Sequence, residues 1–296
     1  MNEPIIDITD LSKFYGKTRG IEKVNLEIGK GEVFGFIGPN GAGKSTTIRI
    51  LMNLIFPSDG SARIMGLDVV RQTKEIMRNV GYIPSDANAY SYMEAEEFLN
   101  YLARFYDVPD AAGRIRELSK LFDLDLKRKI SDLSSGNKKK VSIIQSLVHR
   151  PEVLIMDEPT TGLDPLMQSV FFDLMRSENK KGTTIFFSSH ILGEVQMFCR
   201  RVAIIKEGKI VQVEDIDTLR KKQLKKVFFE FGEQANETNI SIPGVVNLVG
   251  GPGNAMSFMF SGDINELTRF LSQRKIVNLI IEEPSLDEIF MHYYQI

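Results

Sequence analysis

Apolar positions along most of the chain follow two periods, which predict strands that alternate with helices. Short apolar runs predict buried strands, and apolar residues three or four positions apart predict helices. The expected strands cover residues 5–8, 21–28, 31–37, 61–65, 153–156, 183–187, 202–205 and 210–213. The expected helices cover residues 46–55, 134–148, 166–178 and 191–198, and a charged helical segment spans about 91–130. Strands alternating with helices indicate an α/β core.

A basic, polar segment at 219–226 follows this core, and we predict a linker there between domains at 1–218 and 227–296. A length of 296 residues agrees with two domains. The second domain is expected to be a small α+β domain. Its expected strands cover 227–231, 256–260 and 276–281, its helix covers 264–273, and Ser285 and Glu288 have the capping-box spacing of a final helix that runs to Tyr294.

Composition restricts the classes of function. A formal net charge of −2 gives no support for nucleic-acid binding. The single cysteine, Cys199, excludes an intramolecular disulfide framework and a cysteine-rich zinc cluster, so a reducing cytoplasm is the simplest setting. The N-terminus has no pattern of a secretion signal. No window approaches the roughly 18 apolar residues of a membrane-spanning helix. Any membrane role therefore requires a partner chain.

Residues 38–46 read GPNGAGKST and match the phosphate-loop pattern Gly-x-x-x-x-Gly-Lys-Ser between an expected strand and an expected helix. Glycines let the backbone amides wrap around an anion, and the helix N-terminus favours negative charge. Lys44 is expected to reach the β- and γ-phosphates, and the Ser45 hydroxyl to bind magnesium. A glycine-rich turn that only starts a helix is the alternative, but the context on both sides favours polyphosphate. The candidate loop residues are Gly38, Pro39, Asn40, Gly41, Ala42, Gly43, Lys44, Ser45 and Thr46.

Two carboxylates follow the apolar run at 153–156. Asp157 is expected to bind the magnesium, through water, and Glu158 is the candidate to accept a proton from the attacking water. Alone, the pair would be ordinary carboxylates at the end of a strand. Beside a phosphate loop, they predict nucleotide hydrolysis.

Three further motifs point to a family. They are LSSGN at 133–137, TGLDP at 161–165 and SSH at 188–190. With the phosphate loop and the Asp-Glu strand, their order and spacing resemble the ATP-binding-cassette (ABC) ATPases over residues 5–214. The resemblance implies a P-loop NTPase fold, the ABC nucleotide-binding domain. It also implies an antiparallel β subdomain and a helical subdomain at about 86–135.

The resemblance also implies roles for single residues at the chain's own nucleotide. Tyr15 matches the aromatic residue that stacks on adenine. Lys44, Ser45 and Thr46 match the phosphate and magnesium ligands, and His190 matches the switch residue that contacts the γ-phosphate. The resemblance thus implies a Mg-dependent ATPase with ATP and Mg²⁺ as its ligands, in which Glu158, His190 and Lys44 are catalytic.

Other matched residues serve a second nucleotide. Ser134 and Gly136 match the signature, which in the family faces the nucleotide of the other subunit, and Asp164 matches the loop that communicates between the two sites. The resemblance therefore implies a head-to-tail dimer, which we expect to be a homodimer. Ser135 and Asn137 depart from the glycine and glutamine usual in the signature. They are expected to preserve hydroxyl and amide chemistry while altering affinity across the dimer.

Another departure lies in GYIPSDANAY, residues 81–90. The family places a glutamine after this proline, and that glutamine touches magnesium and links to the membrane partner. Here Ser85 and then Asp86 follow, so magnesium binding by Ser85 is doubtful. The lysines at 138–140 are expected to form a solvated helix face. His149 and His292 match no motif and are expected to be structural or exposed.

The leading hypothesis is the ATPase subunit of a transporter, peripheral on the cytoplasmic face of the cell membrane, with a membrane permease on a separate chain and no nucleic acid partner. Residues 283–290 resemble the tail of subunits paired with type-2 exporter permeases, which favours export. The helical subdomain is the expected permease contact. The sequence leaves open the cargo, the permease, the role of the C-terminal domain, and whether the second ATPase is the same chain.

The sequence leaves two alternative classes of function. A soluble ABC ATPase acting on ribosomes or DNA is the runner-up, but such members carry two cassettes or a long coiled coil, and this chain has neither pattern. A GTPase or small-molecule kinase would leave the signature unexplained, and no Asn-Lys-x-Asp guanine-reading motif is present.

Overall fold

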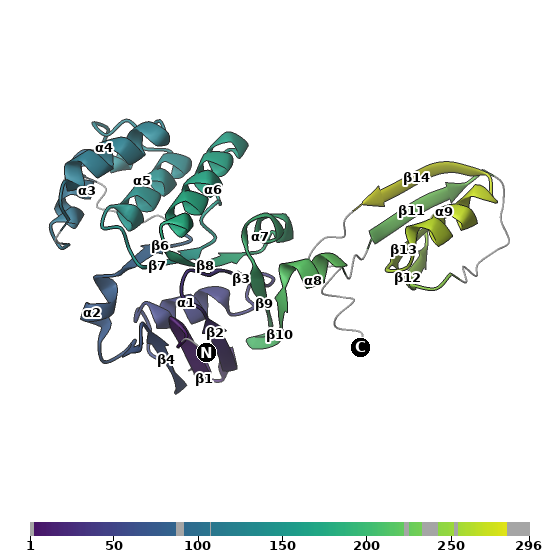
Figure 1. The fold of residues 1–296 in the computed structure, drawn as a ribbon, viewed down its shortest axis with the longest axis horizontal. Helices are drawn as coiled ribbons and strands as arrows, with labels where there is room; N and C mark the ends of the chain where they lie inside the picture. Colours follow the sequence, from purple (N-terminus) through teal and green to yellow (C-terminus); the bar gives the residue numbers. More distant parts are fainter. Residues whose placement is uncertain are drawn as a thin grey trace. The chain divides into compact units, whose positions relative to one another are not determined.

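A six-stranded sheet in the order β10-β9-β3-β8-β7-β6 forms the centre of the first half of the fold (Figure 1). In the computed structural model its strands are β3 (Val33–Ile37), β6 (Val80–Ile83), β7 (Val153–Asp157), β8 (Thr184–Ser189), β9 (Arg201–Lys206) and β10 (Lys209–Asp215). β10 is antiparallel to β9, and the other five strands are parallel. The carboxyl ends of those five strands therefore share one edge, which is where open α/β sheets bind ligands.

A second sheet is antiparallel and has the order β2-β1-β4-β5. Its strands are β1 (Ile6–Tyr15), β2 (Thr18–Ile28), β4 (Asp59–Ile64) and β5 (Leu67–Asp68). Helix α1 (Lys44–Leu51) contacts β7 of the central sheet and both β2 and β4 of the antiparallel sheet. One apolar core joins the two sheets through Ile48 and Leu51 of this helix. The predicted antiparallel β subdomain is present.

The remaining helices of this part are α2 (Thr73–Met77), α3 (Ala95–Ala103), α4 (Ala111–Leu121), the 3-10 turn η1 (Ile130–Asp132), α5 (Ser135–Leu147), α6 (Pro165–Lys180) and α7 (Leu192–Phe198). Helices α3, α4 and α5 contact one another. Helices α3 and α4 lie within residues 86–135, where the helical subdomain was predicted, and α5 follows that range. Figure 1 shows α3 to α6 on the opposite side of the central sheet from α1. The N-caps of α5 and α6 are Ser134 and Asp164, whose side chains accept first-turn N–H groups.

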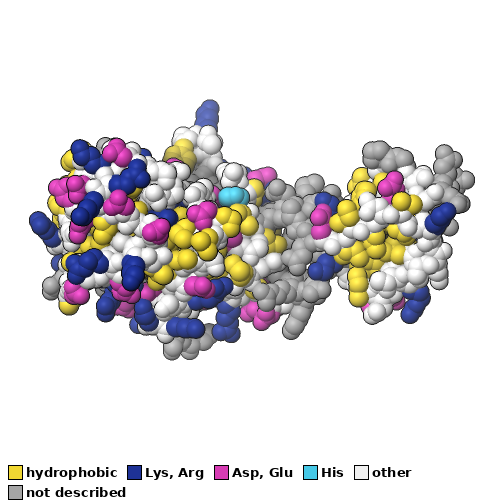
Figure 2. Space-filling model, turned by 90° about the horizontal axis from the view of Figure 1, so that it is seen from above, with side chains coloured by type: hydrophobic (Ala, Val, Ile, Leu, Met, Phe, Trp, Pro, Cys, Tyr) yellow, Lys and Arg dark blue, Asp and Glu magenta, His cyan; other side chains and the backbone are white. Residues whose placement is uncertain are grey.

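The C-terminal part contains a four-stranded antiparallel sheet in the order β12-β13-β11-β14. Its strands are β11 (Lys225–Phe231), β12 (Val245–Gly250), β13 (Ala255–Phe260) and β14 (Ile276–Glu282), and its helix is α9 (Ile264–Ser272). Phe229, Phe258 and Leu267 are fully or almost fully buried in its core. Figure 2 shows apolar side chains gathered on one face of this part. Strand β12 was missed by the sequence analysis because its VVNLVG pattern does not alternate cleanly.

The structure describes residues 3–86, 92–106, 108–221, 225–232, 242–251 and 254–282. The chain divides into two compact units, Met1–Asp215 and Ile216–Ile296. Residues 219–226, expected to be a linker, include the end of helix α8 (Ile216–Lys221) and the start of β11. The predicted final helix at 285–294 and His292 lie outside the described residues. Within the described ranges, no helix has the length and apolarity needed to cross a membrane.

Candidate functional site

A pocket of about 320 Å³ lies beside the phosphate loop, at the edge where the parallel strands end. It is lined by Tyr15, Thr18, Arg19, Gly20, Asn40, Gly41, Gly43, Lys44, Ser45, Thr46 and Glu158. The fold thus brings Tyr15, the phosphate loop and Glu158, which are distant in sequence, to one cavity.

Thr18, Arg19 and Gly20 were not identified from the sequence. They reach the pocket because β1 and β2 form a tight hairpin in which Tyr15 pairs with Thr18. Gly16 between them has a positive φ, as a two-residue hairpin turn requires. Tyr15-Gly16-Lys17-Thr18 was therefore the local signal that could have placed these residues beside Tyr15.

The phosphate loop needs glycine where it approaches other backbone. A Cβ on Gly38 would lie 2.2 Å from the carbonyl oxygen of Ile205, closer than any side chain allows. Gly43 has a φ of 111°, and α1 begins directly after it with no side-chain cap. The N–H groups of the first turn therefore have no side-chain acceptor, as an anion-binding helix N-terminus requires.

The Lys44 ammonium is held inside the loop and is almost fully buried. Its Nζ donates to the carbonyl oxygens of Gly38 at 2.7 Å and Pro39 at 3.2 Å. It also lies 3.5 Å from Glu158 Oε1. This places a fixed positive charge in the lining of the pocket.

Glu158 lies between two other predicted catalytic residues. Its Oε1 lies 3.3 Å from His190 Nδ1 and 3.5 Å from Lys44 Nζ. Its backbone has a φ of 47°, a conformation that few non-glycine residues adopt. Its N–H is close to both the carbonyl oxygen and the hydroxyl of Ser188, at 3.2 Å each. The carboxylate is therefore held near a cation and an imidazole, where it can accept a proton from water.

Asp157 and Ser45 have the oxygen atoms that a magnesium ion prefers. Asp157 is 1% exposed, and its Oδ1 accepts a hydrogen bond from Ser188 Oγ at 2.7 Å. Burial, aided by the charge of Asp157, raises the pKa of Tyr82 to about 12. The Ser45 hydroxyl lines the pocket and makes no hydrogen bond to any described residue. These donors fit a hard divalent cation.

Ser134, Gly136 and Asp164 do not line the pocket among the residues described. Ser134 and Asp164 are exposed helix caps, and their side chains accept from the N–H groups of Asn137 and Met167. A Cβ on Gly136 would lie 2.7 Å from the carbonyl oxygen of Gly162, so the signature and the loop of Asp164 are in close contact. These residues form a separate surface from the one that holds Lys44.

Lys139 does not lie on a solvated helix face, so the prediction for this residue was wrong. It is 2% exposed, and its Nζ donates to the carbonyl oxygens of Pro84 and Ser85 at 2.9 Å each and of Glu158 at 3.2 Å. Burial lowers its pKa to about 8, although the surrounding carboxylates oppose this. Helical spacing could have predicted this burial, because Lys139 precedes the buried Ile143 by four residues and so lies on the same helix face.

The Ser85 side chain, the doubtful magnesium ligand, makes no hydrogen bond within the described ranges. Only its carbonyl oxygen is engaged, by Lys139. His149 is mostly buried; its Nε2 lies 3.1 Å from the Val80 carbonyl oxygen and its ring stacks on Tyr106. His149 is therefore structural.

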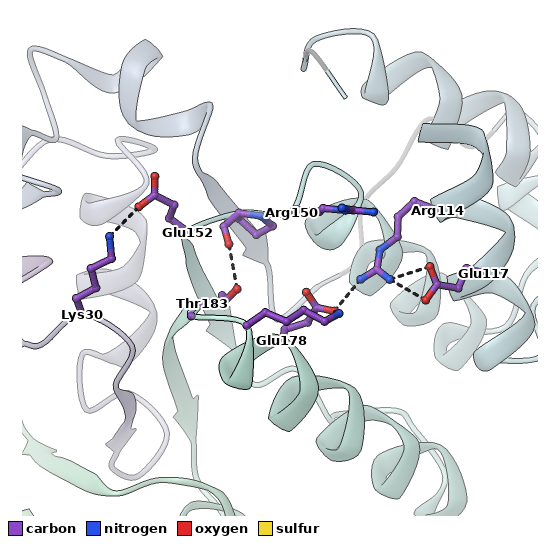
Figure 3. A pocket seen from close by; sticks show the side chains of 10 residues that line it. Lys30, Arg114, Glu117, Arg150, Glu152, Glu178 and Thr183 are labelled. Carbon is purple, nitrogen blue, oxygen red and sulfur yellow. Dashed lines mark hydrogen bonds and ion pairs between the residues drawn. The ribbon is translucent and has the colours of Figure 1, made fainter. Parts of the chain in front are cut away.

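A larger cavity of about 650 Å³ lies at the opposite edge, where β7 and β8 begin. Figure 3 shows Arg114 of α4 between Glu117 and Glu178. Arg114 NH2 lies 2.8 Å from Glu178 Oε1, and Lys181 Nζ also lies 2.8 Å from that oxygen. The charged groups of this cavity therefore pair mainly with one another.

A family model and a relative of nearly the same length place the chain in a family. The model of the ABC transporter family matches residues 21–161. The bacitracin transport ATP-binding protein BcrA of Enterococcus faecalis is 31% identical over 294 residues, covering 97% of this chain and 96% of that protein. This chain belongs to the ABC transporter ATP-binding family. A second BcrA, of Bacillus licheniformis, is 36% identical over 236 residues, covering 78% of this chain and 76% of that protein.

A solved ATP-binding subunit of an ABC transporter shares the family fold. Its TM-score is 0.69 at 31% sequence identity, and the match covers 73% of this chain and 92% of that chain. The ABC cassette fold predicted from the motifs is therefore confirmed, as are ATP binding and the assignment as an ATPase. These relatives favour transport over an ABC ATPase that acts on ribosomes or DNA. The roles of the individual residues stay predictions.

Proposed function

We propose that this ABC ATPase binds ATP with magnesium in the phosphate-loop pocket, hydrolyses it, and drives export through a membrane permease on a separate chain. One observation carries the hydrolytic part of the proposal. The Glu158 carboxylate lies 3.3 Å from His190 and 3.5 Å from Lys44, and both Glu158 and Lys44 line the pocket. A candidate base and a phosphate-binding cation thus line one cavity, and the switch histidine contacts the base.

The pocket supplies separate groups for the parts of ATP. Tyr15 lines it with 47% of its surface exposed, so its ring can stack on adenine. The amides of Gly38–Thr46 and the Lys44 ammonium bind the phosphates. In a single chain the pocket is open to solvent at Tyr15, so these residues alone do not shield bound ATP from water.

Ser45 and Asp157 would hold the magnesium. When bound there, magnesium would supply positive charge that offsets the negative charge of the phosphate oxygens. Glu158 accepts a proton from the attacking water, and His190 contacts the γ-phosphate. Lys44 stabilises the negative charge that develops beside it.

A second copy of the chain completes the site. Ser134, Gly136 and Asp164 are solvent-accessible and lie outside the pocket lining of their own chain. Exposed hydroxyl and backbone N–H groups at the start of α5 suit a nucleotide on another subunit. Two chains arranged head to tail would each contribute this surface to the other's ATP.

Export through a membrane partner is supported by several relatives. Besides the bacitracin transport proteins, the Nod factor export ATP-binding protein I of Paraburkholderia xenovorans is 33% identical over 213 residues, covering 71% of this chain and 70% of that protein. The helical subdomain exposes Tyr92, Tyr101 and Phe105, which offer an apolar contact to a permease at the cytoplasmic face of the membrane. On the face drawn in Figure 2, Lys and Arg are interspersed with Asp and Glu over the first unit, which does not suit a nucleic acid.

A trapped dimer tests the shared site. The Glu158→Gln chain should bind ATP and magnesium without turning it over, and it should elute as a dimer in size-exclusion chromatography with light scattering. Adding Ser134→Arg to this chain should prevent the dimer without removing ATP binding. A Glu158→Gln single variant that stays monomeric with ATP bound, or a double variant that still elutes as a dimer, would contradict the shared site. Purification of the chain with ribosomes or DNA, and with no membrane protein, would contradict transport.

A further inference from the structure

The Lys139 ammonium is buried among backbone carbonyl groups next to the proposed catalytic site. An ammonium has three N–H donors, and Lys139 has three acceptors, the carbonyl oxygens of Pro84, Ser85 and Glu158 at 2.9, 2.9 and 3.2 Å. A buried charge is costly unless it is hydrogen-bonded. All three N–H groups donate to backbone carbonyl oxygens, so these hydrogen bonds hold the backbone of Pro84, Ser85 and Glu158 in place.

The three acceptors belong to segments that are distant in sequence. Pro84 and Ser85 follow β6, and Glu158 follows β7, the neighbouring parallel strand. Lys139 itself is in the first half of α5, whose N-cap is the signature residue Ser134. One side chain therefore connects the signature helix, the Ser85 loop and the backbone of Glu158.

Glu158 needs such support because its backbone is strained. A non-glycine residue with φ near 47° is disfavoured, and it persists only where the surrounding structure holds it. Ser188 engages the N–H of Glu158, and Lys139 engages its carbonyl oxygen. The peptide groups on both sides of Glu158 are thereby held, and so is the direction in which the carboxylate leaves the backbone.

We propose that Lys139 is a positioning residue for ATP hydrolysis, which holds the peptide of Glu158 and the Ser85 loop so that the Glu158 carboxylate stays aimed at the phosphate-loop pocket. This inference rests on the proposed function of Glu158. It also explains how Ser85 can stand in the usual glutamine position, because this loop is tied to the site through its carbonyl groups and not through a long side chain.

The acidic groups near Lys139 do not replace these hydrogen bonds. Asp157, Asp86 and Glu158 all favour its charged form electrostatically. A neutral side chain of similar length would remove the ammonium donor from the three carbonyl groups, although the Glu158 carbonyl oxygen also accepts from the Thr161 N–H at 3.3 Å. It would also remove a nearby positive charge from these carboxylates. The effect should fall on the position of Glu158, while the phosphate loop, which makes no hydrogen bond to Lys139 in the described structure, should bind ATP as before.

The test compares Lys139→Met with Lys138→Met, which changes a neighbouring lysine that is only partly buried and whose side chain makes no hydrogen bond to either loop in the described structure. We expect Lys139→Met to lower kcat for ATP hydrolysis by roughly 10- to 100-fold, as small misplacements of catalytic groups do. The Kd for ATP should stay within about twofold, since remote positioning losses appear in kcat when binding is untouched. Lys139→Gln keeps two donors and should recover part of the kcat. Lys138→Met should match the unaltered chain.

Several outcomes would overturn the proposal. They are a Lys139→Met kcat equal to that of Lys138→Met, a Gln variant no better than the Met variant, or a parallel loss of kcat and ATP affinity, which would indicate general loosening. Thermal unfolding of each variant shows whether it is folded. If Lys139→Met does not fold, Lys139→Gln decides, because an unaltered kcat would contradict positioning and a reduced kcat with unaltered Kd would support it. An unaltered chain that hydrolyses no ATP would contradict the proposed function instead.

Discussion

The two edges of the central sheet hold charged cavities of opposite character. The edge where the strands end has the smaller pocket, about 320 Å³, and the edge where β7 and β8 begin has the larger, about 650 Å³. In the larger cavity Arg114, drawn beside Glu178 in Figure 3, lies 2.8 Å from Glu178. Lys181 also lies 2.8 Å from Glu178. In the smaller pocket the contacts of Glu158 with Lys44 and His190 are longer, at 3.5 and 3.3 Å.

This difference teaches that cavity size does not locate the site. At the strand-beginning edge, opposite charges satisfy each other and join α4 to α6, so they contribute structure. At the strand-ending edge, α1 begins without a side-chain cap, and the Ser45 hydroxyl has no hydrogen-bond partner among the described residues. The Glu158 carboxylate has only these longer contacts with described residues there, so all three groups are available to a ligand. Parallel strands collect such loops at their carboxyl ends.

The largest expected effect is a loss of stability when the ion pair in the larger cavity is removed. Arg114→Met should leave Glu178 buried without its main partner and lower the free energy of unfolding by about 3 kcal/mol. The loss should lie at the lower end for a buried pair because Lys181 still contacts Glu178. Urea unfolding followed by circular dichroism measures it. At a temperature where the variant is folded, kcat should be unaltered, and a lost kcat there would assign function to this edge.

Removing the Lys44 ammonium should impair nucleotide binding at the edge where the parallel strands end, and it should destabilise the fold less than Arg114→Met does. Lys44→Ala should weaken ATP binding by roughly 100-fold, because the ammonium contributes charge-assisted hydrogen bonds to phosphate. Isothermal titration calorimetry with ATP and magnesium measures the Kd. Lys30→Ala, in the larger cavity, is the matched control and should bind ATP normally. Equal weakening by both changes would contradict the contrast between the edges.

The smallest expected effect is on the pH dependence of stability, through His149, which lines neither cavity. Burial lowers the pKa of His149 to about 4, from 6.5 in the unfolded chain. The unfolded state therefore takes up a proton first as pH falls. The stability that neutral His149 contributes is complete above pH 6.5 and is lost as pH falls through about 4. The loss should be about 2 kcal/mol, discounted for partial exposure.

His149→Phe keeps a ring to stack on Tyr106 and should flatten this part of the pH dependence. Urea unfolding at pH 7, 6 and 5 with both chains measures the difference. An equally steep loss of stability in the Phe variant would assign the acid sensitivity to other groups.

The sequence predicted local features better than the contacts between them. The phosphate loop is a contiguous motif, and the strands and helices around it follow from periodicity, so the α/β core could be predicted. The pairing of β1 with β2, which brings Thr18 and Arg19 to the pocket, depends on a hairpin that the motifs do not encode.

Lys139 illustrates the other limit of sequence patterns. Three consecutive lysines look alike in a charge pattern, but a helix turns by about 100° per residue and points each in a different direction. Only Lys139 of the three is fully buried. Its acceptors come from two loops whose proximity follows from the pairing of β6 with β7, which is a tertiary contact.

Hydrolysis by the Glu158→Gln chain tests the central claim most directly. The measurement is the steady-state release of phosphate from ATP and magnesium, beside the Kd for ATP, with Glu117→Gln at the opposite edge as the matched control. Glu158→Gln should lose at least about 100-fold in kcat while its Kd is kept, because the amide cannot accept a proton from water. Glu117→Gln should keep the kcat of the unaltered chain. A Glu158→Gln chain that hydrolyses ATP as fast as Glu117→Gln would contradict the account.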